Sequence, residues 1–571
     1  MKNITNIMAQ GNVNTAPRLR EILLRGSALV ALAMIAGISL QVPAAHAATL
    51  YDNGNVTISL ESTLSWTAGV RVASPNAQLL ANPNGDDGDR NFRHGLVENR
   101  GDILEQLDAA DGNYGFHGSF AAWLDTVYLQ HNQNNSASTY NGFGSHNSFS
   151  SSTVNRQGRR FEPLSAYVFG SEDFGNGDQN VTWRIGRQTV LWGDSLFFGS
   201  DAIAGGQAPL DLYRATTVAD LQAQDLFLPT GSIYVSYAIN QLLTIQAYDN
   251  FEFEADQFPS SGSYFSANDF LSAGSDRILI AQTPLGELNS YHGRDKQPNN
   301  GFGQFGVALR SHIGDVDVGA YYIRFDDKAP EIYAFAPAPG APTPAKGGLS
   351  VGTYSLVYAQ NINAFGVSGS GTVMGANVAG EISGRTNMDL FSGPGIMIPY
   401  GEQANTTTHP QYAVGDTIDA QISTIYSTPP LPLMPGGAFI QAEAVWNKVL
   451  TVTANKSALV PGRTAEGAAI EAVFTPAYYN LLPETEIEVP IGVTANVIGK
   501  SQYDPNINAG TGLINLGVKA IYRQSWIVGM NYARYYGTPK AVPAADNNPS
   551  GTNGQPFIDR DFVSVYAQHT F

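Results

Sequence analysis

The sequence has no cysteine and carries little charge. Only 14% of its 571 residues are charged, against about 25% in a typical soluble domain. The absence of cysteine excludes disulfides and thiolate metal sites. Acidic residues outnumber basic ones by 49 to 31, which argues against a nucleic-acid partner. With 27 Tyr and 27 Phe, the chain is too aromatic to be disordered.

Long apolar runs are also missing from most of the chain. After Ala47 no stretch of 18 or more apolar residues occurs, which excludes a protein built of membrane-spanning helices. Before Ala47, three arginines precede an apolar run at 26–40, and an A-x-A sequence follows at 45–47. A membrane anchor would need about 20 apolar residues, so the pattern predicts a cleaved secretory signal peptide at 1–47. Residues 48–571 then form the mature protein, with 27 basic and 48 acidic residues.

What the mature chain does have is alternation with a period of two. Between Glu486 and Val497, apolar residues alternate with polar ones, and the same pattern occurs within 414–427, 437–450 and 512–523. Such segments are strands with one apolar and one polar face. The polar face is mostly Gly, Ser, Thr, Asn and Gln, which is typical of a barrel lumen and not of a soluble sandwich.

The spacing of these segments predicts an all-β fold, a single transmembrane antiparallel outer-membrane β-barrel of about 18 strands. One miscounted hairpin would give 16. The expected strands are 55–72, 96–107, 114–129, 161–171, 181–192, 231–239, 242–254, 300–312, 315–327, 353–367, 371–385, 414–427, 437–450, 466–478, 485–498, 512–523, 525–537 and 561–571.

Long and short connections alternate strictly between these strands, as in outer-membrane barrels. The short turns carry hairpin residues, as in Asp111-Gly112 and Gly314-Asp315. Both termini are therefore expected in the periplasm. Among the long connections, 328–352 contains five prolines, which we expect to forbid ladder pairing there.

The last predicted strand ends on Phe571. A terminal Phe in an alternating strand resembles the signal that outer-membrane barrels present to the barrel-assembly machinery. His569 stands where such signals usually carry Tyr or an apolar residue.

Three motifs give the chain a resemblance to a known family. They are Gly186-Arg187-Gln188 leading to Trp192-Gly193-Asp194-Ser195, the run from Glu381 to Met388, and Asp559-Arg560-Asp561-Phe562. The chain resembles the proteobacterial outer-membrane proteins catalogued as domain of unknown function 1302. The resemblance implies a barrel with a signal peptide, often encoded beside periplasmic lipid-handling proteins, and a suspected role in transporting hydrophobic compounds.

Clean alternation breaks down at 181–230. Strand parity would place Arg187 in lipid, at a cost of roughly 2–4 kcal/mol near the bilayer midplane. We expect a bulge near Gly186 to turn Arg187 into the lumen beside Arg184. Helical spacing predicts a short helix at 209–226, and we expect 193–230 to fold into the barrel as a plug or constriction. The alternative is an extracellular loop with an interfacial arginine.

The candidate residues of the lumen or constriction are charged or amide residues on predicted inward positions and on the inserted segment. They are Arg184, Arg187, Gln188, Asp194, Asp201, Arg214, Asp249, Glu252, Glu381, Arg385, Glu443 and Lys519.

No complete enzyme or cofactor signature occurs in the sequence. Gly193-Asp194-Ser195-Leu196 matches the signature of one esterase family, but none of the nine histidines follows an Asp by three residues, so the Ser lacks its expected base. We predict no enzyme activity and no cofactor. Asp86, Asp87 and Asp89 offer calcium-type oxygens, but the spacing lacks the downstream Glu of an EF-hand, and we interpret them as a solvated extracellular loop.

Three functions remain open. The first is a channel or transporter for hydrophobic or amphipathic small molecules such as fatty acids, esters or sterol-like compounds. The second is a diffusion porin for small polar solutes, and the third is a non-conducting surface scaffold or envelope-complex protein. The expected partners are outer-membrane lipid, lipopolysaccharide, the assembly machinery, a small-molecule substrate and periplasmic lipid-handling proteins.

Overall fold

The computed structural model describes residues 48–175, 179–217, 226–340, 342–393, 396–539 and 554–571. The predicted signal peptide at 1–47 lies outside the described residues. Within the described residues, no helix is both long and apolar enough to span a membrane.

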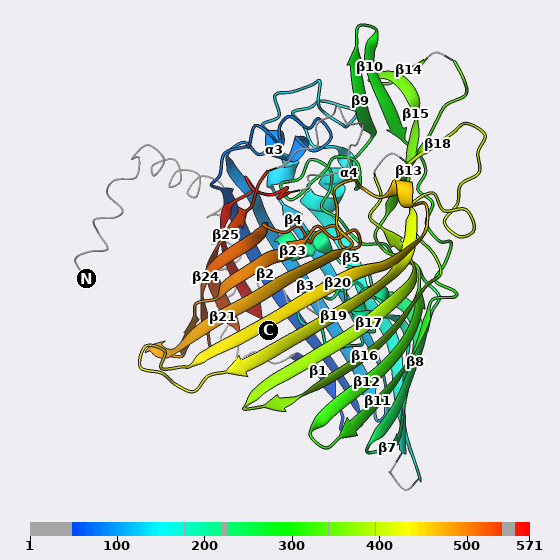
Figure 1. Cartoon of the computed structure of the whole chain (residues 1–571). Coiled ribbons are helices and arrows are strands. Elements are labelled where there is room, and N and C mark those ends of the chain that lie inside the picture. Colours follow the sequence, from blue (N-terminus) through cyan, green and yellow to red (C-terminus); the bar gives the residue numbers. More distant parts are fainter. Residues whose placement is uncertain (1–47, 176–178, 218–225, 341, 394–395, 540–553) are drawn as a thin grey trace.

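Eighteen strands form one closed antiparallel barrel (Figure 1). They are β2 (Val56–Arg71), β3 (Gly95–Asp111), β4 (Tyr114–Asp125), β5 (Arg159–Phe174), β6 (Gln179–Gln188), β7 (Thr230–Asn240), β8 (Leu243–Asn250), β11 (Phe305–Ile313), β12 (Val316–Phe325), β16 (Ile362–Val373), β17 (Ala376–Leu390), β19 (Ala413–Ser427), β20 (Ala438–Ala454), β21 (Glu466–Leu482), β22 (Thr485–Glu488) continued by β23 (Ile491–Gly499), β24 (Gly512–Tyr522), β25 (Trp526–Tyr536) and β26 (Phe562–Thr570).

The barrel closes where the last strand meets the first. β26 pairs with β2 from Thr63 opposite Thr570 to Arg71 opposite Phe562. Each remaining strand pairs with its neighbour along the chain. The predicted barrel of 18 strands is therefore confirmed, and the alternative of 16 is excluded.

One predicted strand was placed wrongly. The strand expected at 353–367 is β16, which begins at Ile362 and turns at Met374-Gly375. Residues 348–357 instead form β15 (Gly348–Val357), which lies outside the barrel sheet. Periodicity alone could not separate the two, because both segments alternate.

A second, smaller sheet stands over the end of the barrel that carries the long connections (Figure 1). Its strands are β9 (Arg277–Thr283), β10 (Gly286–His292), β13 (Glu331–Phe335), β14 (Thr343–Ala345), β15 and β18 (Ile396–Ile398). The expectation that prolines forbid pairing in 328–352 was wrong. β14 contains Pro344 and pairs with β15 alone, as an edge strand, where a missing N–H is tolerated.

The two faces of the barrel differ in polarity. On β17, Ile382 is 54% exposed, whereas Glu381 and Ser383 on either side are 3% exposed. On β19, Ile422 is 60% exposed between buried Gln421 and buried Ser423. An apolar outer face and a polar inner face are the architecture of an outer-membrane barrel.

The strand ends near the short turns carry aromatic residues. His569 stacks on Trp526 with ring centroids 4.2 Å apart and planes at 12°. Its ring therefore occupies an aromatic site, which accounts for His where Tyr is usual. The backbones of Phe571 and Ser62 exchange two hydrogen bonds, at 2.9 and 3.0 Å, which fixes the carboxyl end against β2.

Candidate functional site: a segment inside the barrel

The connection after β6 does not stay at the barrel rim. The ring of Trp192 lies 5.1 Å from the ring of Tyr248 on β8 and 6.0 Å from that of Tyr321 on β12. Trp192 and Ile203 are buried in a cluster with residues of β8, β11, β12 and β16. We call residues 190–211 the inner segment, because Trp192 and Ile203 within it pack against the inward faces of these strands.

Glu443 on β20 holds one part of the inner segment. Its two carboxylate oxygens accept hydrogen bonds from three consecutive backbone N–H groups, those of Leu196 (3.1 Å), Phe197 (2.5 Å) and Phe198 (2.8 Å). Glu443 is 2% exposed. A buried carboxylate is tolerated where several donors bond its charge, so Glu443 and the segment stabilise each other.

Glu381 on β17 holds two further points of the inner segment. It accepts from the N–H of Asp194 at 3.1 Å and from the N–H of Ile203 at 2.6 Å. Gly193 has a φ of +91°, and a Cβ there would lie 2.0 Å from Oε2 of Glu381. A glycine is therefore required at this approach.

Arg385 lies four residues after Glu381 on β17, and it binds carbonyl oxygens of the inner segment. Its guanidinium donates to the carbonyl oxygens of Ser200, Asp201 and Ala202 at 3.2, 3.1 and 2.7 Å. It also forms an ion pair with Asp419 on β19 at 3.0 Å. Carboxylates thus bind the N–H groups of the segment and an arginine binds its C=O groups.

Asp201 adds a titratable group to these contacts. It is buried, and its Oδ2 accepts from the side chain of Asn447 on β20 at 3.2 Å. Burial raises the pKa of Asp201 well above its ordinary value of 3.8, and the charges of Asp504 and Asp419 act in the same direction, against Arg385.

Raising the pH is therefore expected to loosen the inner segment. An acid with a raised pKa contributes stability that is complete below its unfolded pKa and is lost as the pH rises through its folded pKa. We expect the conductance of the barrel to increase from acidic to alkaline buffer, and the increase to be smaller in the variant Asp201→Asn. An undiminished pH response in that variant would contradict the role given to Asp201.

The other predicted lumen residues are spread over several places. Arg184 lies over the rings of Tyr234 and Tyr167, at 4.6 and 5.7 Å, and Lys519 pairs with Glu488 at 3.1 Å. Gln188 is buried and donates to two backbone carbonyls at 3.2 Å.

The predicted helix at 209–226 is described only in part. α5 (Leu212–Thr217) contains Arg214, which is buried. The part of the predicted helix at 218–225 lies outside the described residues.

The expectation for Arg187 was wrong. The ladders of β6 with β5 and β7 show no register shift at Gly186, so no bulge turns the arginine inward. Arg187 bonds Glu252 at 3.0 Å and the carbonyl of Pro229 at 3.0 Å. Glu252 compensates its charge at the end of the strand.

Asp249 was also misplaced. Tyr248 points inward to Trp192, so Asp249, the next residue of β8, has the opposite parity and is exposed. The sequence pattern around 242–254 did not reveal the face, because acidic and aromatic residues alternate there.

A cavity of about 390 Å³ borders the inner segment on the side of the short turns. Asp194 from the segment, Arg310 on β11 and Tyr321 on β12 line it, together with serines of β16. Arg310 donates to the hydroxyl of Tyr321 at 3.4 Å. Arg310 was not predicted, although its place beside exposed Leu309 gives it an inward parity.

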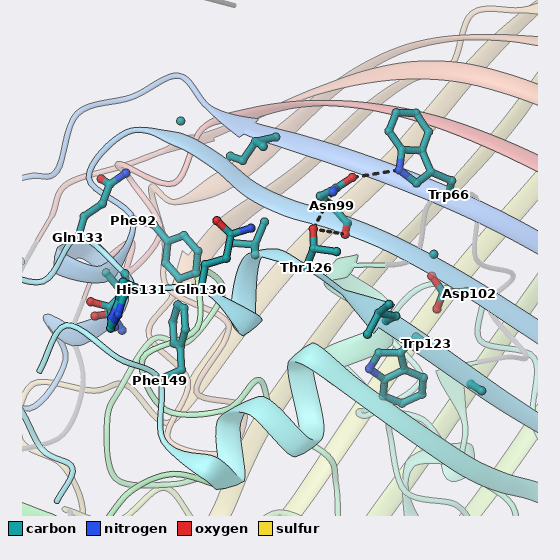
Figure 2. Close-up of a pocket in the computed structure, with 18 of the residues that line it drawn as sticks. Trp66, Phe92, Asn99, Asp102, Trp123, Thr126, Gln130, His131, Gln133 and Phe149 are labelled. Carbon is teal, nitrogen blue, oxygen red and sulfur yellow. Dashed lines mark hydrogen bonds between the residues drawn. The ribbon is translucent and has the colours of Figure 1, made fainter. Parts of the chain in front are cut away.

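A second hollow lies on the outer face. It has a volume of about 930 Å³ and is covered by loop residues such as His131 and Phe149 (Figure 2). Its strand residues include Trp66 and Leu124, which share the face of exposed Phe116. This hollow is therefore separate from the lumen.

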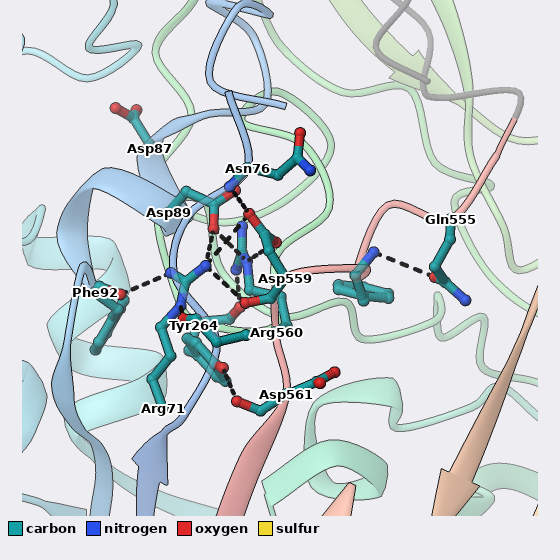
Figure 3. Close-up of polar contacts among 12 residues, drawn as sticks. Arg71, Asn76, Asp87, Asp89, Phe92, Tyr264, Gln555, Asp559, Arg560 and Asp561 are labelled. Carbon is teal, nitrogen blue, oxygen red and sulfur yellow. Dashed lines mark hydrogen bonds and ion pairs between the residues drawn. The ribbon is translucent and has the colours of Figure 1, made fainter. Parts of the chain in front are cut away.

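The acidic loop expected to be solvated is buried, which corrects that interpretation. Asp86, Asp87 and Asp89 are at most 1% exposed. Asp89 forms ion pairs at 2.8 Å with Arg71 on β2 and with Arg560 (Figure 3). It joins the first loop to the residues before β26, at the seam where the barrel closes.

The strand ladders and the inner segment define a transmembrane β-barrel of the outer-membrane type with a partly filled interior. The chain belongs to the family described as Protein of unknown function (DUF1302), whose sequence model matches residues 28–571. The predicted family is thereby confirmed. No curated protein matches the chain.

Several solved structures are similar to it. OccAB4 of Acinetobacter baumannii is 6% identical, with 91% of this chain and 100% of that chain covered and a TM-score of 0.42. The outer membrane channel DcaP of Acinetobacter baumannii is 9% identical, with 92% and 100% covered and a TM-score of 0.32. OccK2 of Pseudomonas aeruginosa, solved in complex with glucuronate, is 8% identical, with 90% and 98% covered and a TM-score of 0.37. The closed antiparallel sheet, with its apolar outer face and polar inner face, shows that the chain is an outer-membrane barrel.

Proposed function

We propose that the protein is an outer-membrane channel, narrowed by the inner segment, that admits small amphipathic solutes. The observation that carries the proposal is the binding of 190–211 to the inward residues Glu381, Arg385 and Glu443. Barrels of 16–18 strands otherwise enclose an aqueous channel. A segment fixed inside such a lumen limits the size of the solutes that can pass through it.

Two arginines that lie beside tyrosine rings support the proposal that the solutes are amphipathic. Arg184 lies over Tyr234, and Arg310 bonds Tyr321. Such a pair offers an anionic group a charged partner and offers an apolar group a ring face. We therefore favour amphipathic anions, such as alkyl carboxylates, over wholly apolar compounds, because the cavity beside Arg310 is lined by hydroxyls and charges.

The same proposal orients the barrel. Short turns face the periplasm and long loops face outward in barrels of this class. Both β2 and β26 have their terminal ends on the side of the short turns, so both termini would be periplasmic. The exposed apolar residues of the outer face would contact membrane lipid and lipopolysaccharide.

Swelling of liposomes that contain the refolded mature protein tests this function. We expect alkyl carboxylates to enter faster than neutral sugars of similar mass. The variant Arg310→Gln should reduce carboxylate entry, and the control Lys448→Gln, a change at a half-exposed lysine paired with Glu466, should not. Equal rates for sugars and carboxylates would instead indicate a diffusion porin, and no swelling would indicate a non-conducting scaffold.

A further inference from the structure

Three buried carboxylates from two distant loops meet above the barrel. Asp86 and Asp87 lie at the start of α3 (Asp87–Asn91) in the loop between β2 and β3, and Asp269 lies between β8 and β9. One oxygen of each lies within 4.8 Å of the others. Two ligands on opposite sides of a calcium ion are separated by about 5 Å, because each lies 2.3–2.6 Å from the metal. The spacing therefore fits a common cation.

The charge of this cluster is poorly compensated by the protein. Arg90 forms an ion pair with Asp86. The nearby arginines Arg71 and Arg560 pair instead with Asp89 and Asp559.

Buried oxygens without a hydrogen-bond partner give an independent indication. Within the described residues, Oδ1 of Asp86, of Asp269 and of Asn141 make no hydrogen bond. Asn141 borders the cluster, since its backbone N–H donates to Asp87 at 3.1 Å. Its amide nitrogen donates to Asn84 and to the carbonyl of Arg277, so its Oδ1 is the atom left over. Buried polar atoms are rarely left without a partner.

We propose that Asp86, Asp87, Asp269 and Asn141 bind a divalent cation, and that the cation is calcium. All four residues offer oxygen, and calcium accepts six to eight oxygen ligands in flexible geometry, whereas magnesium demands a near-ideal octahedron. Asp89 is close in sequence to Asp86 and Asp87 but is not a ligand, because its carboxylate forms ion pairs with Arg71 and Arg560.

A cation at this site would fasten three loops to one another. Asp86 and Asp87 belong to the first loop, Asn141 to the loop between β4 and β5, and Asp269 to the loop before β9. The same region is already joined to the barrel seam through Asp89. Calcium would therefore hold the loop cap over the end of the barrel opposite the short turns.

Terbium, which replaces calcium and emits when a nearby tyrosine is excited, gives a direct probe. Tyr140 is buried beside the cluster, and burial followed by the charge of Asp87 raises its pKa. We expect the refolded mature protein to sensitise terbium emission, calcium to displace the signal at lower concentration than magnesium, and calcium to raise the melting temperature by several degrees over EDTA.

The variant Asp269→Asn should lose the emission and the thermal shift while still running as a folded barrel on gels without heating. Asp249→Asn, a change at an exposed aspartate, should keep both. If Asp269→Asn does not fold, displacement of terbium by calcium in the unmodified protein remains decisive. Absence of sensitised emission together with equal melting temperatures in calcium and EDTA would overturn the proposal.

Discussion

Replacing Glu443 with alanine is expected to raise the single-channel conductance of the barrel several-fold. The carboxylate accepts three backbone N–H groups of the inner segment. Each buried donor left without a partner costs about 1–3 kcal/mol, so the segment loses most of what holds this part of it to β20. Adding Glu381→Ala, which removes two more acceptors, should increase the conductance further.

The matched control for this change is Glu471→Ala. Glu471 lies directly opposite Glu443 on β21 and accepts from Thr494 at 3.0 Å. We expect its conductance to remain near that of the unmodified protein in the same planar-bilayer recording. A similar rise in both variants would mean that wall charge, and not release of the segment, sets the conductance.

The second large effect concerns the seam of the barrel. Arg560→Met should lower the free energy of unfolding by about 3–5 kcal/mol, the usual cost of removing one partner from a buried ion pair. Arg560 is 1% exposed and pairs with Asp89 at 2.8 Å and Asp559 at 3.6 Å. Its loss leaves an excess of buried carboxylate next to Arg71, at the closure between β2 and β26.

Urea unfolding of the mature protein in lipid vesicles measures this loss. Arg523→Met is the control, because Arg523 pairs with Glu484 in an exposed turn and surface pairs contribute little. The double variant Arg560→Met with Asp89→Asn should recover part of the loss. Equal stability of the two single variants would contradict the role of the seam network.

The sequence predicted the barrel well because the physical signal is local. Alternation around Ile422 or Ile487 and short turns such as Gly314-Asp315 depend on neighbouring residues. This local signal also explains why the strand at 353–367 was misplaced. β15, in the second sheet, alternates just as the barrel strand β16 does. Nothing local says which sheet a strand joins.

The site could be predicted only as a set of residues and not as contacts. Glu381, Arg385 and Glu443 were selected from charge and parity, but their partners lie about 180 to 250 residues away in sequence. The placement of Arg187 failed for the same reason, since Glu252 reaches it from beyond β8. The sequence likewise grouped Asp89 with Asp86 and Asp87. In the folded chain Asp89 pairs with Arg560, and Asp269 from a distant loop joins the other two aspartates.

The proposed channel function requires that the inner segment narrow the lumen. A variant in which a short glycine-serine linker replaces 193–226 should still close, because β6 and β7 are adjacent strands. In planar bilayers the unmodified protein should show small conductance steps, and this variant should show steady openings larger by roughly an order of magnitude, as expected for an unobstructed barrel of 16–18 strands. Equal conductance in the two folded proteins would show that the inner segment does not narrow the lumen.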